Sequence, residues 1–143
     1  MTKHLLATAL AASLACSAKV AADPAEGLNV IVTSPERQAQ MMAMVLSVQT
    51  VSAHDRTVNL TLCGAAGELA LKATQTEALL PSNKSPTMLL QTLIDSGAKV
   101  QVCPLYLPNA GKSPEDLLPG IGVAKPAAMA GKLLDRAYQN LTF

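Results

Sequence analysis

Short apolar runs of strand length alternate with helical segments along most of this chain. Five runs are expected to form strands: residues 28–33, 58–63, 98–103, 121–123 and 138–143. Helices are expected between them, and Ser-Pro pairs at 34–35, 85–86 and 113–114 supply helix starts, because serine caps a helix and proline fits its first turn. This alternation predicts an α/β fold, in which helices cover both faces of a mostly parallel sheet of about five strands.

Composition favours one domain and excludes some classes of partner. The chain has 143 residues, of which 50% are hydrophobic, so it can build a single aliphatic core. Its aromatic residues are Tyr106, Tyr138 and Phe143, which argues against the stacking platforms of single-stranded nucleic acid sites. The formal net charge is +1 and no basic run occurs, so nucleic acid is not expected as a partner.

The first 22 residues have the pattern of a cleavable signal peptide. Lys3 and His4 precede a Leu/Ala run over residues 5–15, and small residues stand at the expected cleavage positions before Asp23. The run is too short for a stable membrane span. We therefore expect a periplasmic or otherwise exported protein whose mature domain is residues 23–143. Lipidation of Cys16 is less favoured, because serine replaces the large aliphatic residue usual three positions earlier.

A cysteine ends each of two expected strands in the mature domain, Cys63 and Cys103. The carboxyl ends of parallel strands are where ligands and chemistry collect in open α/β sheets. Cys103 is therefore the candidate catalytic thiol, and Lys112 on the following loop is the nearest cation in sequence that could favour its thiolate. The alternative is that Cys103 is a small buried hydrophobic residue.

Two other stretches were weighed as sites. Gly64 and Gly67 follow the second strand as a candidate anion-binding loop, although the third glycine and the ribose-binding acid of a dinucleotide fingerprint are not all present. Methionines in the first helix fill the core rather than bind copper, and its apolar face is expected to be wide, comprising Met41, Met42, Met44, Val45, Leu46 and Val48. No bound metal and no cofactor is expected.

The order of motifs resembles the DsrE/DsrF-like family, also called YchN-like. The matching features are a strand ending in Thr-Ser, an Ala/Met-rich helix, a strand ending in a small-residue loop, a Leu-rich helix, Gly-Ala-Lys-Val-Gln-Val-Cys at 97–103 and Leu-Leu-Pro-Gly-Ile at 117–121. The resemblance runs from Asn29 to Phe143 and is closest to exported, single-domain members. It implies a flavodoxin-like three-layer sandwich and a homo-oligomer of three or six subunits.

The resemblance also implies a function for Cys103. This residue matches the cysteine that carries sulfur as a persulfide in some members, so a sulfur carrier or sulfurtransferase-type relay with a donor or acceptor protein is expected. Many relatives have a second cysteine where Tyr106 stands, and an Arg-Gly pair where this chain has Ala110 and Gly111. Two alternatives stay open: a non-catalytic small-ligand or protein-binding module with structural cysteines, and a soft-metal binder that uses both thiols.

The relation between the two cysteines depends on the order of the strands. A flavodoxin-like order with the first strand between the second and third separates Cys63 and Cys103 by two strand spacings, roughly 10 Å. A disulfide needs Cα atoms within about 7 Å. Two unbridged thiols at the same edge of the sheet are therefore expected, with Cys63 as a candidate second thiol.

Overall fold

The computed structural model describes residues 23–143, which form one five-stranded parallel sheet. The order across the sheet is β4-β3-β2-β1-β5. The strands are β1 (Gly27–Val32), β2 (Thr57–Leu62), β3 (Lys99–Val102), β4 (Gly122–Val123) and β5 (Tyr138–Thr142). The α/β class and the parallel sheet predicted from the sequence are confirmed. The expected signal peptide and Cys16 lie outside the described residues.

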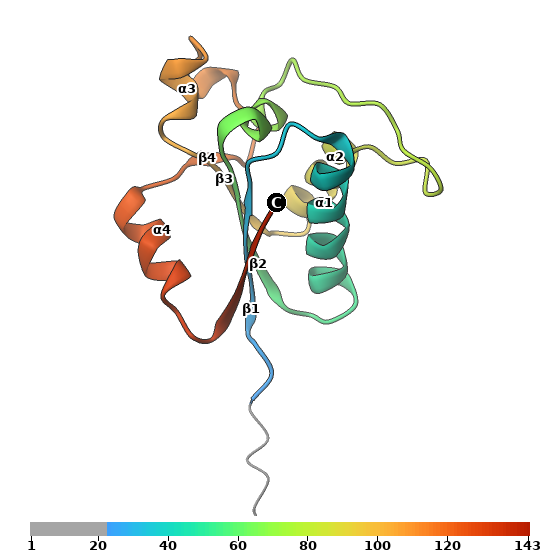
Figure 1. The fold of residues 1–143 in the computed structure, drawn as a ribbon, viewed down its shortest axis with the longest axis vertical. Coiled ribbons are helices and arrows are strands. Elements are labelled where there is room, and N and C mark those ends of the chain that lie inside the picture. The colour runs from blue at the N-terminus through green and yellow to red at the C-terminus, as the bar shows by residue number, and fades with distance from the viewer. Residues whose placement is uncertain (1–22) are drawn as a thin grey trace, which may run out of the picture.

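Helices cover both faces of the sheet (Figure 1). They are α1 (Arg37–Ser52), α2 (Pro86–Asp95), α3 (Tyr106–Asn109) and α4 (Pro126–Leu133), with short 3₁₀ helices η1 (Gly64–Ala70) and η2 (Pro114–Asp116). α1 and α2 pack on one face, α4 lies over the other, and η1 and α3 lie near the carboxyl ends of the strands (Figure 1). Within residues 23–143, none of the helices has the length and apolar character needed to cross a membrane.

The core lies between the sheet and the helices α1 and α2. Alternate residues of the three central strands point into it, and they are almost completely buried: Val30, Val32, Val58, Leu60, Leu62, Val100 and Val102. Met44 of α1 and Leu90 and Leu93 of α2 pack against them with no exposed surface. Each such aliphatic side chain contributes about 1.5–3 kcal/mol on burial, so this layer supplies most of the folding free energy.

Two of the three predicted helix starts are confirmed. The Ser85 side chain accepts a hydrogen bond from the Met88 N–H at 3.2 Å, and Ser113 forms a capping box with Asp116. The third prediction is wrong, because α1 begins only after Glu36 and has no side-chain cap. The Ser34 hydroxyl instead accepts from the Glu36 N–H at 3.0 Å, which tightens the turn before the helix.

The predicted wide apolar face of α1 is also wrong in part. The buried residues are Gln40, Ala43, Met44 and Ser47, so the inward stripe is narrow and contains two polar side chains. Met42 and Leu46 are 51% and 39% exposed. The helix packs against the sheet and α2 along one line, and residues on its outer side remain in solvent.

A row of asparagines crosses the face of the sheet beneath α4. Asn29 of β1 is paired in register with Asn59 of β2 and Asn140 of β5. The Asn29 amide donates to Asn140 Oδ1 at 2.9 Å and to the Lys132 carbonyl at 2.7 Å, and its oxygen accepts from Asn59 at 3.0 Å. The Lys132 ammonium also donates to Asn59. These bonds join three strands to α4. Asn29 is almost fully buried, so its amide depends on these partners within the protein.

Gly67 leaves room for an aromatic side chain above η1. A Cβ at this position would lie 2.3–2.7 Å from three ring atoms of Tyr106. The absence of a side chain therefore allows the Tyr106 ring to pack directly on the η1 backbone. This contact fixes η1, which follows Cys63, against the segment that follows Cys103.

Replacing Asn29 by alanine should destabilise the fold. Three polar groups lose their partner beneath α4, so we expect the free energy of unfolding to fall by about 2–3 kcal/mol. Asn140→Ala is the matched control, because Asn140 is exposed and water can replace its bonds. Urea unfolding of both variants measures the difference, and equal midpoints for the two would contradict the central place of Asn29.

Gly67→Ala should cost about 1–3 kcal/mol, because the new methyl group overlaps the Tyr106 ring. Gly131→Ala in α4 is the control, since a Cβ there meets no atom within 4 Å and alanine favours a helix. Thermal unfolding should show a lower midpoint for the first variant only. A Gly67→Ala protein as stable as the parent would mean that Tyr106 is not held on η1.

Candidate functional site

The strand order brings the two cysteines together at the carboxyl edge of the sheet. Leu62 at the end of β2 is paired with Val102 at the end of β3, and the Cys103 N–H donates to the Leu62 carbonyl at 2.8 Å. Cys63 and Cys103 therefore follow neighbouring strands at the same level, on the side opposite the buried pair. The expectation that the first strand separates them is wrong, because β1 lies on the far side of β2.

The correction changes what the two thiols can do together. Neighbouring strands lie about 4.8 Å apart, against the roughly 10 Å expected from the other order. That spacing falls inside the range of about 4.4–6.8 Å between Cα atoms that a disulfide requires. Both cysteines are free thiols and both are partly exposed, so the pair is also within reach of small reagents.

The Cys63 thiol lies beside Cys103 at the ends of two paired strands, and its pKa reflects its surroundings. Burial raises the pKa of Cys63 to about 12, and the nearby Cys103 thiol contributes in the same direction. Cys63 therefore keeps its proton at neutral pH.

The chain turns sharply after Cys103 and builds a pocket beside it. Pro104 occupies the second position of the turn, and the Tyr106 N–H closes it on the Cys103 carbonyl at 3.0 Å. α3 follows at once, at Tyr106–Asn109. Cys103 lines a mainly apolar pocket of about 390 Å³ together with Gly64, Leu105, Tyr106, Asn109 and Ala110.

Gly64 and Gly67 both have structural roles at this edge. Gly64 follows Cys63 with a φ of 52°, in the left-handed region that glycine adopts without strain, and it lines the pocket. Gly67 is buried beneath the Tyr106 ring. The anion-binding hypothesis for this loop stays untested, and the contacts seen here explain both glycines through backbone conformation and packing.

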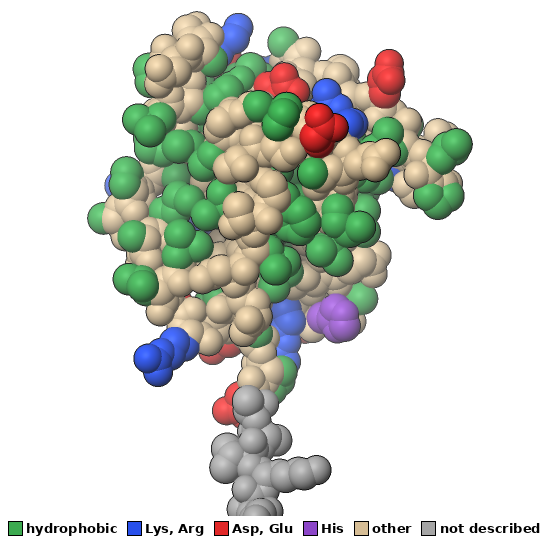
Figure 2. All heavy atoms as spheres, viewed as in Figure 1, with side chains coloured by type: hydrophobic (Ala, Val, Ile, Leu, Met, Phe, Trp, Pro, Cys, Tyr) green, Lys and Arg blue, Asp and Glu red, His purple; other side chains and the backbone are tan. Residues whose placement is uncertain are grey.

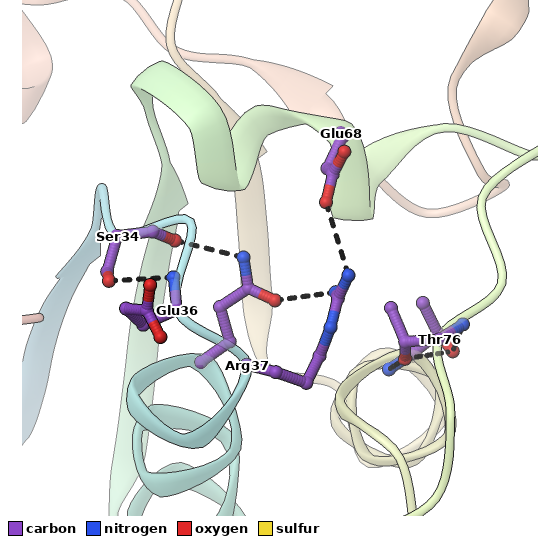
Figure 3. A network of polar contacts seen from close by, with 7 residues as sticks. Ser34, Glu36, Arg37, Glu68 and Thr76 are labelled. Atoms are coloured by element: carbon purple, nitrogen blue, oxygen red, sulfur yellow. Dashed lines mark hydrogen bonds and ion pairs between the residues drawn. The ribbon is translucent and has the colours of Figure 1, made fainter.

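A polar network holds η1 in place from the side of α1 (Figure 3). Gln40 is fully buried; its amide donates to the Ser34 carbonyl at 2.9 Å, and its oxygen accepts from Arg37 at 2.8 Å. Arg37 also forms an ion pair with Glu68 of η1 at 3.6 Å. The ion pair is partly exposed and contributes little by itself, and the bond from buried Gln40 holds the Arg37 side chain that forms it.

Tyr106 remains an uncharged phenol in this setting. Burial raises the pKa of its hydroxyl, and the Glu68 carboxylate nearby adds to the effect. The pocket wall next to Cys103 is therefore neutral. Lys112, the cation expected to assist the thiolate, follows α3, and its backbone N–H donates to the Leu107 carbonyl at 2.8 Å; its proposed role stays a prediction.

The cysteine pocket is not the largest hollow in the described part of the chain. A cavity of about 620 Å³ lies between α1 and the projecting segment at 78–80, lined mainly by apolar side chains. Apolar side chains are spread over the visible face of the molecule and occur on its projecting segment (Figure 2). Met42 and Leu46 of α1 and Leu80 of the projecting segment are exposed. Among residues 23–143, no group of three His, Cys, Asp or Glu side chains could hold a metal ion.

Sequence reasoning identified the two thiols but missed the residues that position them. Gln40 follows Arg37 and Gln38 in the first turns of α1, and the sequence carried no signal that marked it as the buried one. Tyr106 was noted only as a departure from the family pattern. Its packing on Gly67 could not be read from spacing, because it depends on the turn that Pro104 begins.

No family model and no curated protein sequence matches this chain. Solved structures do match it. The YchN protein from E. coli superposes with a TM-score of 0.68 at 17% sequence identity, over 82% of this chain and 99% of that one. The protein of unknown function MTH1491 from Methanobacterium thermoautotrophicum superposes with a TM-score of 0.57 at 12% identity, over 82% and 97%. The resemblance found in the sequence is thus confirmed at the level of the fold, which is that of YchN.

Proposed function

We propose that this protein is a sulfur carrier in which Cys103 accepts sulfane sulfur as a persulfide and passes it to an acceptor. The observation that supports this most directly is the pairing of two thiols at the carboxyl edge of the sheet, with Cys103 open to an apolar pocket. The fold shared with YchN agrees with the family resemblance on which the sulfur chemistry was first expected.

Loading is a thiol exchange reaction. The Cys103 thiolate attacks the outer sulfur of a donor persulfide, a new S–S bond forms at Cys103, and the donor leaves as a thiolate. Transfer to an acceptor thiolate is the same step with Cys103 as the leaving group. Cys63 assists by donating its S–H to the Cys103 sulfur, which stabilises the attacking anion in the first step and the leaving anion in the second.

The pocket suits a small and polarisable group. Leu105, Tyr106 and Ala110 surround the thiol with apolar surface, and the neutral Tyr106 introduces no charge that would repel a persulfide anion. Its volume of about 390 Å³ exceeds what one or two sulfur atoms need, so a donor or acceptor group can enter together with the sulfur. Donor and acceptor proteins are part of the proposal.

Export and assembly belong to the proposal too. Residues 1–22, which lie outside the described part of the chain, are proposed to be a cleaved signal peptide. The mature protein is proposed to assemble as a trimer or hexamer of identical subunits. A soft-metal site is the main alternative, because two adjacent thiolates are good ligands for copper(I). Metal binding needs both cysteines, whereas sulfur loading needs Cys103 alone, so single substitutions separate the two functions.

Incubation with inorganic polysulfide should add one sulfur atom to the protein through Cys103. Intact-mass spectrometry of residues 23–143 should show a gain of about 32 Da that a reducing thiol removes, because a persulfide is a reversible modification. Cys103→Ser should abolish the gain and Cys63→Ser should retain it. Loss of loading in both single variants would contradict a carrier that needs Cys103 alone, and sulfur found on Cys63 alone would overturn the assignment of Cys103.

Alkylation should reveal the raised pKa of Cys63. Below a pKa of about 12 the thiolate fraction of Cys63 rises about tenfold per pH unit, so its initial rate of iodoacetamide modification should still be increasing at pH 10. An ordinary thiol levels off near pH 8.5–9. Peptide mapping after brief labelling gives the rate at each pH, and a plateau near pH 9 for Cys63 would contradict the burial that raises its pKa.

A further inference from the structure

Cys63 supports loading only as a hydrogen-bond donor, yet it stands where a second sulfur reaction is possible. It lies beside Cys103 at the ends of two neighbouring strands that are in register, and both residues are free and partly exposed. The Cys103 N–H donates to the Leu62 carbonyl, which fixes the position of Cys103 along β2. The Cys63 N–H donates to the Val32 carbonyl at 2.8 Å, which fixes the position of Cys63 along β1. The pair is therefore held in position by the sheet itself.

We propose that Cys63 is a resolving thiol, which attacks the Cys103 persulfide, releases its outer sulfur as sulfide and leaves a Cys63–Cys103 disulfide. The inference rests on the proposed function and adds an activity to it, namely reduction of sulfane sulfur by the protein's own thiol pair. The substrate class is any donor that can place sulfane sulfur on Cys103, such as a polysulfide or a persulfide.

The reaction balances within the loaded protein. Cys63 Sγ forms a bond to Cys103 Sγ, and the bond between Cys103 Sγ and the outer sulfur breaks. The electron pair of the broken bond leaves with the outer sulfur, which takes the Cys63 proton and departs as hydrosulfide. The sulfane sulfur is reduced by two electrons and the two thiols are oxidised to the disulfide. A dithiol reductant must then reopen the disulfide before another cycle.

Geometry favours this reaction over attack by a thiol from solution. Neighbouring strands lie about 4.8 Å apart, a spacing within the Cα range that a disulfide requires, and the residues before the two cysteines are paired in register. Two groups held at neighbouring positions of one sheet react as a unimolecular pair, which avoids the entropy cost of an encounter. The raised pKa of Cys63 keeps its thiolate scarce at neutral pH, so the reaction relies on the proximity of the two cysteines, and the proton that Cys63 gives up as its new bond forms is available to the departing sulfur.

The test follows the fate of the loaded sulfur. Protein comprising residues 23–143 is loaded with inorganic polysulfide, desalted and incubated anaerobically without added thiol, while intact mass and free sulfide are measured over time. The wild type should lose the added sulfur, release one equivalent of sulfide and end two hydrogens lighter than the reduced protein. Peptide mapping should then find Cys63 joined to Cys103. The rate should not depend on protein concentration.

Cys63→Ser and Cys63→Ala should still gain one sulfur on prolonged exposure to polysulfide, because the sulfur is carried on Cys103, and once loaded they should release sulfide at least about tenfold more slowly, because the unimolecular partner is gone. Two variants are used so that a folding defect in one does not decide the result. A loaded wild type that keeps its sulfur as long as these variants do, or that yields no disulfide, overturns the resolving role and leaves the carrier function standing. A wild type and variants that never gain sulfur overturn both.

Discussion

The pairing of β2 with β3 is the constraint on which the site depends. Parallel strands in register end at the same level, and the residue after each strand emerges on the same side of the sheet. In this protein those two residues are Cys63 and Cys103, joined through the backbone bond between Cys103 and Leu62. The apolar side chains that anchor both strands in the core thereby also hold the two sulfur atoms together, so no separate scaffold is needed for the pair.

The two faces of the sheet have different chemistry, and each stabilises the arrangement of the strands in its own way. The face toward α1 and α2 is aliphatic and supplies the hydrophobic free energy. The face toward α4 carries the asparagine row, whose hydrogen bonds are directional and therefore fix the lateral register of β1, β2 and β5. A slip of β1 or β2 by one residue would bury aliphatic groups against α4 and break these bonds. The polar row thus fixes the position of β2, which Cys63 follows, whereas β3 is held by its backbone pairing with β2.

Most of the fold could be predicted from the sequence, because it depends on local signals. Alternating apolar runs, the Ser85 cap and the Ser113 capping box predict elements that the structure contains. The strand order could not be obtained in that way, since it is set by packing between distant segments. A general rule pointed to the correct answer: consecutive strands joined by a crossover are neighbours about two-thirds of the time, and β2 and β3 follow it. The site was identified as two cysteines but not as a pair, because their separation depends on that order.

In the proposed mechanism, the raised pKa of Cys63 would make a carrier and a resolving thiol compatible in one protein. A permanently ionised neighbour would attack the Cys103 persulfide at once and would also repel a Cys103 thiolate during loading. A protonated neighbour would do neither. Resolution would then require Cys63 to lose its proton as the new S–S bond forms, which would make it slower than attack by a thiolate. An acceptor that presents a thiolate in the pocket would meet no such requirement, so transfer would outpace resolution when an acceptor is bound.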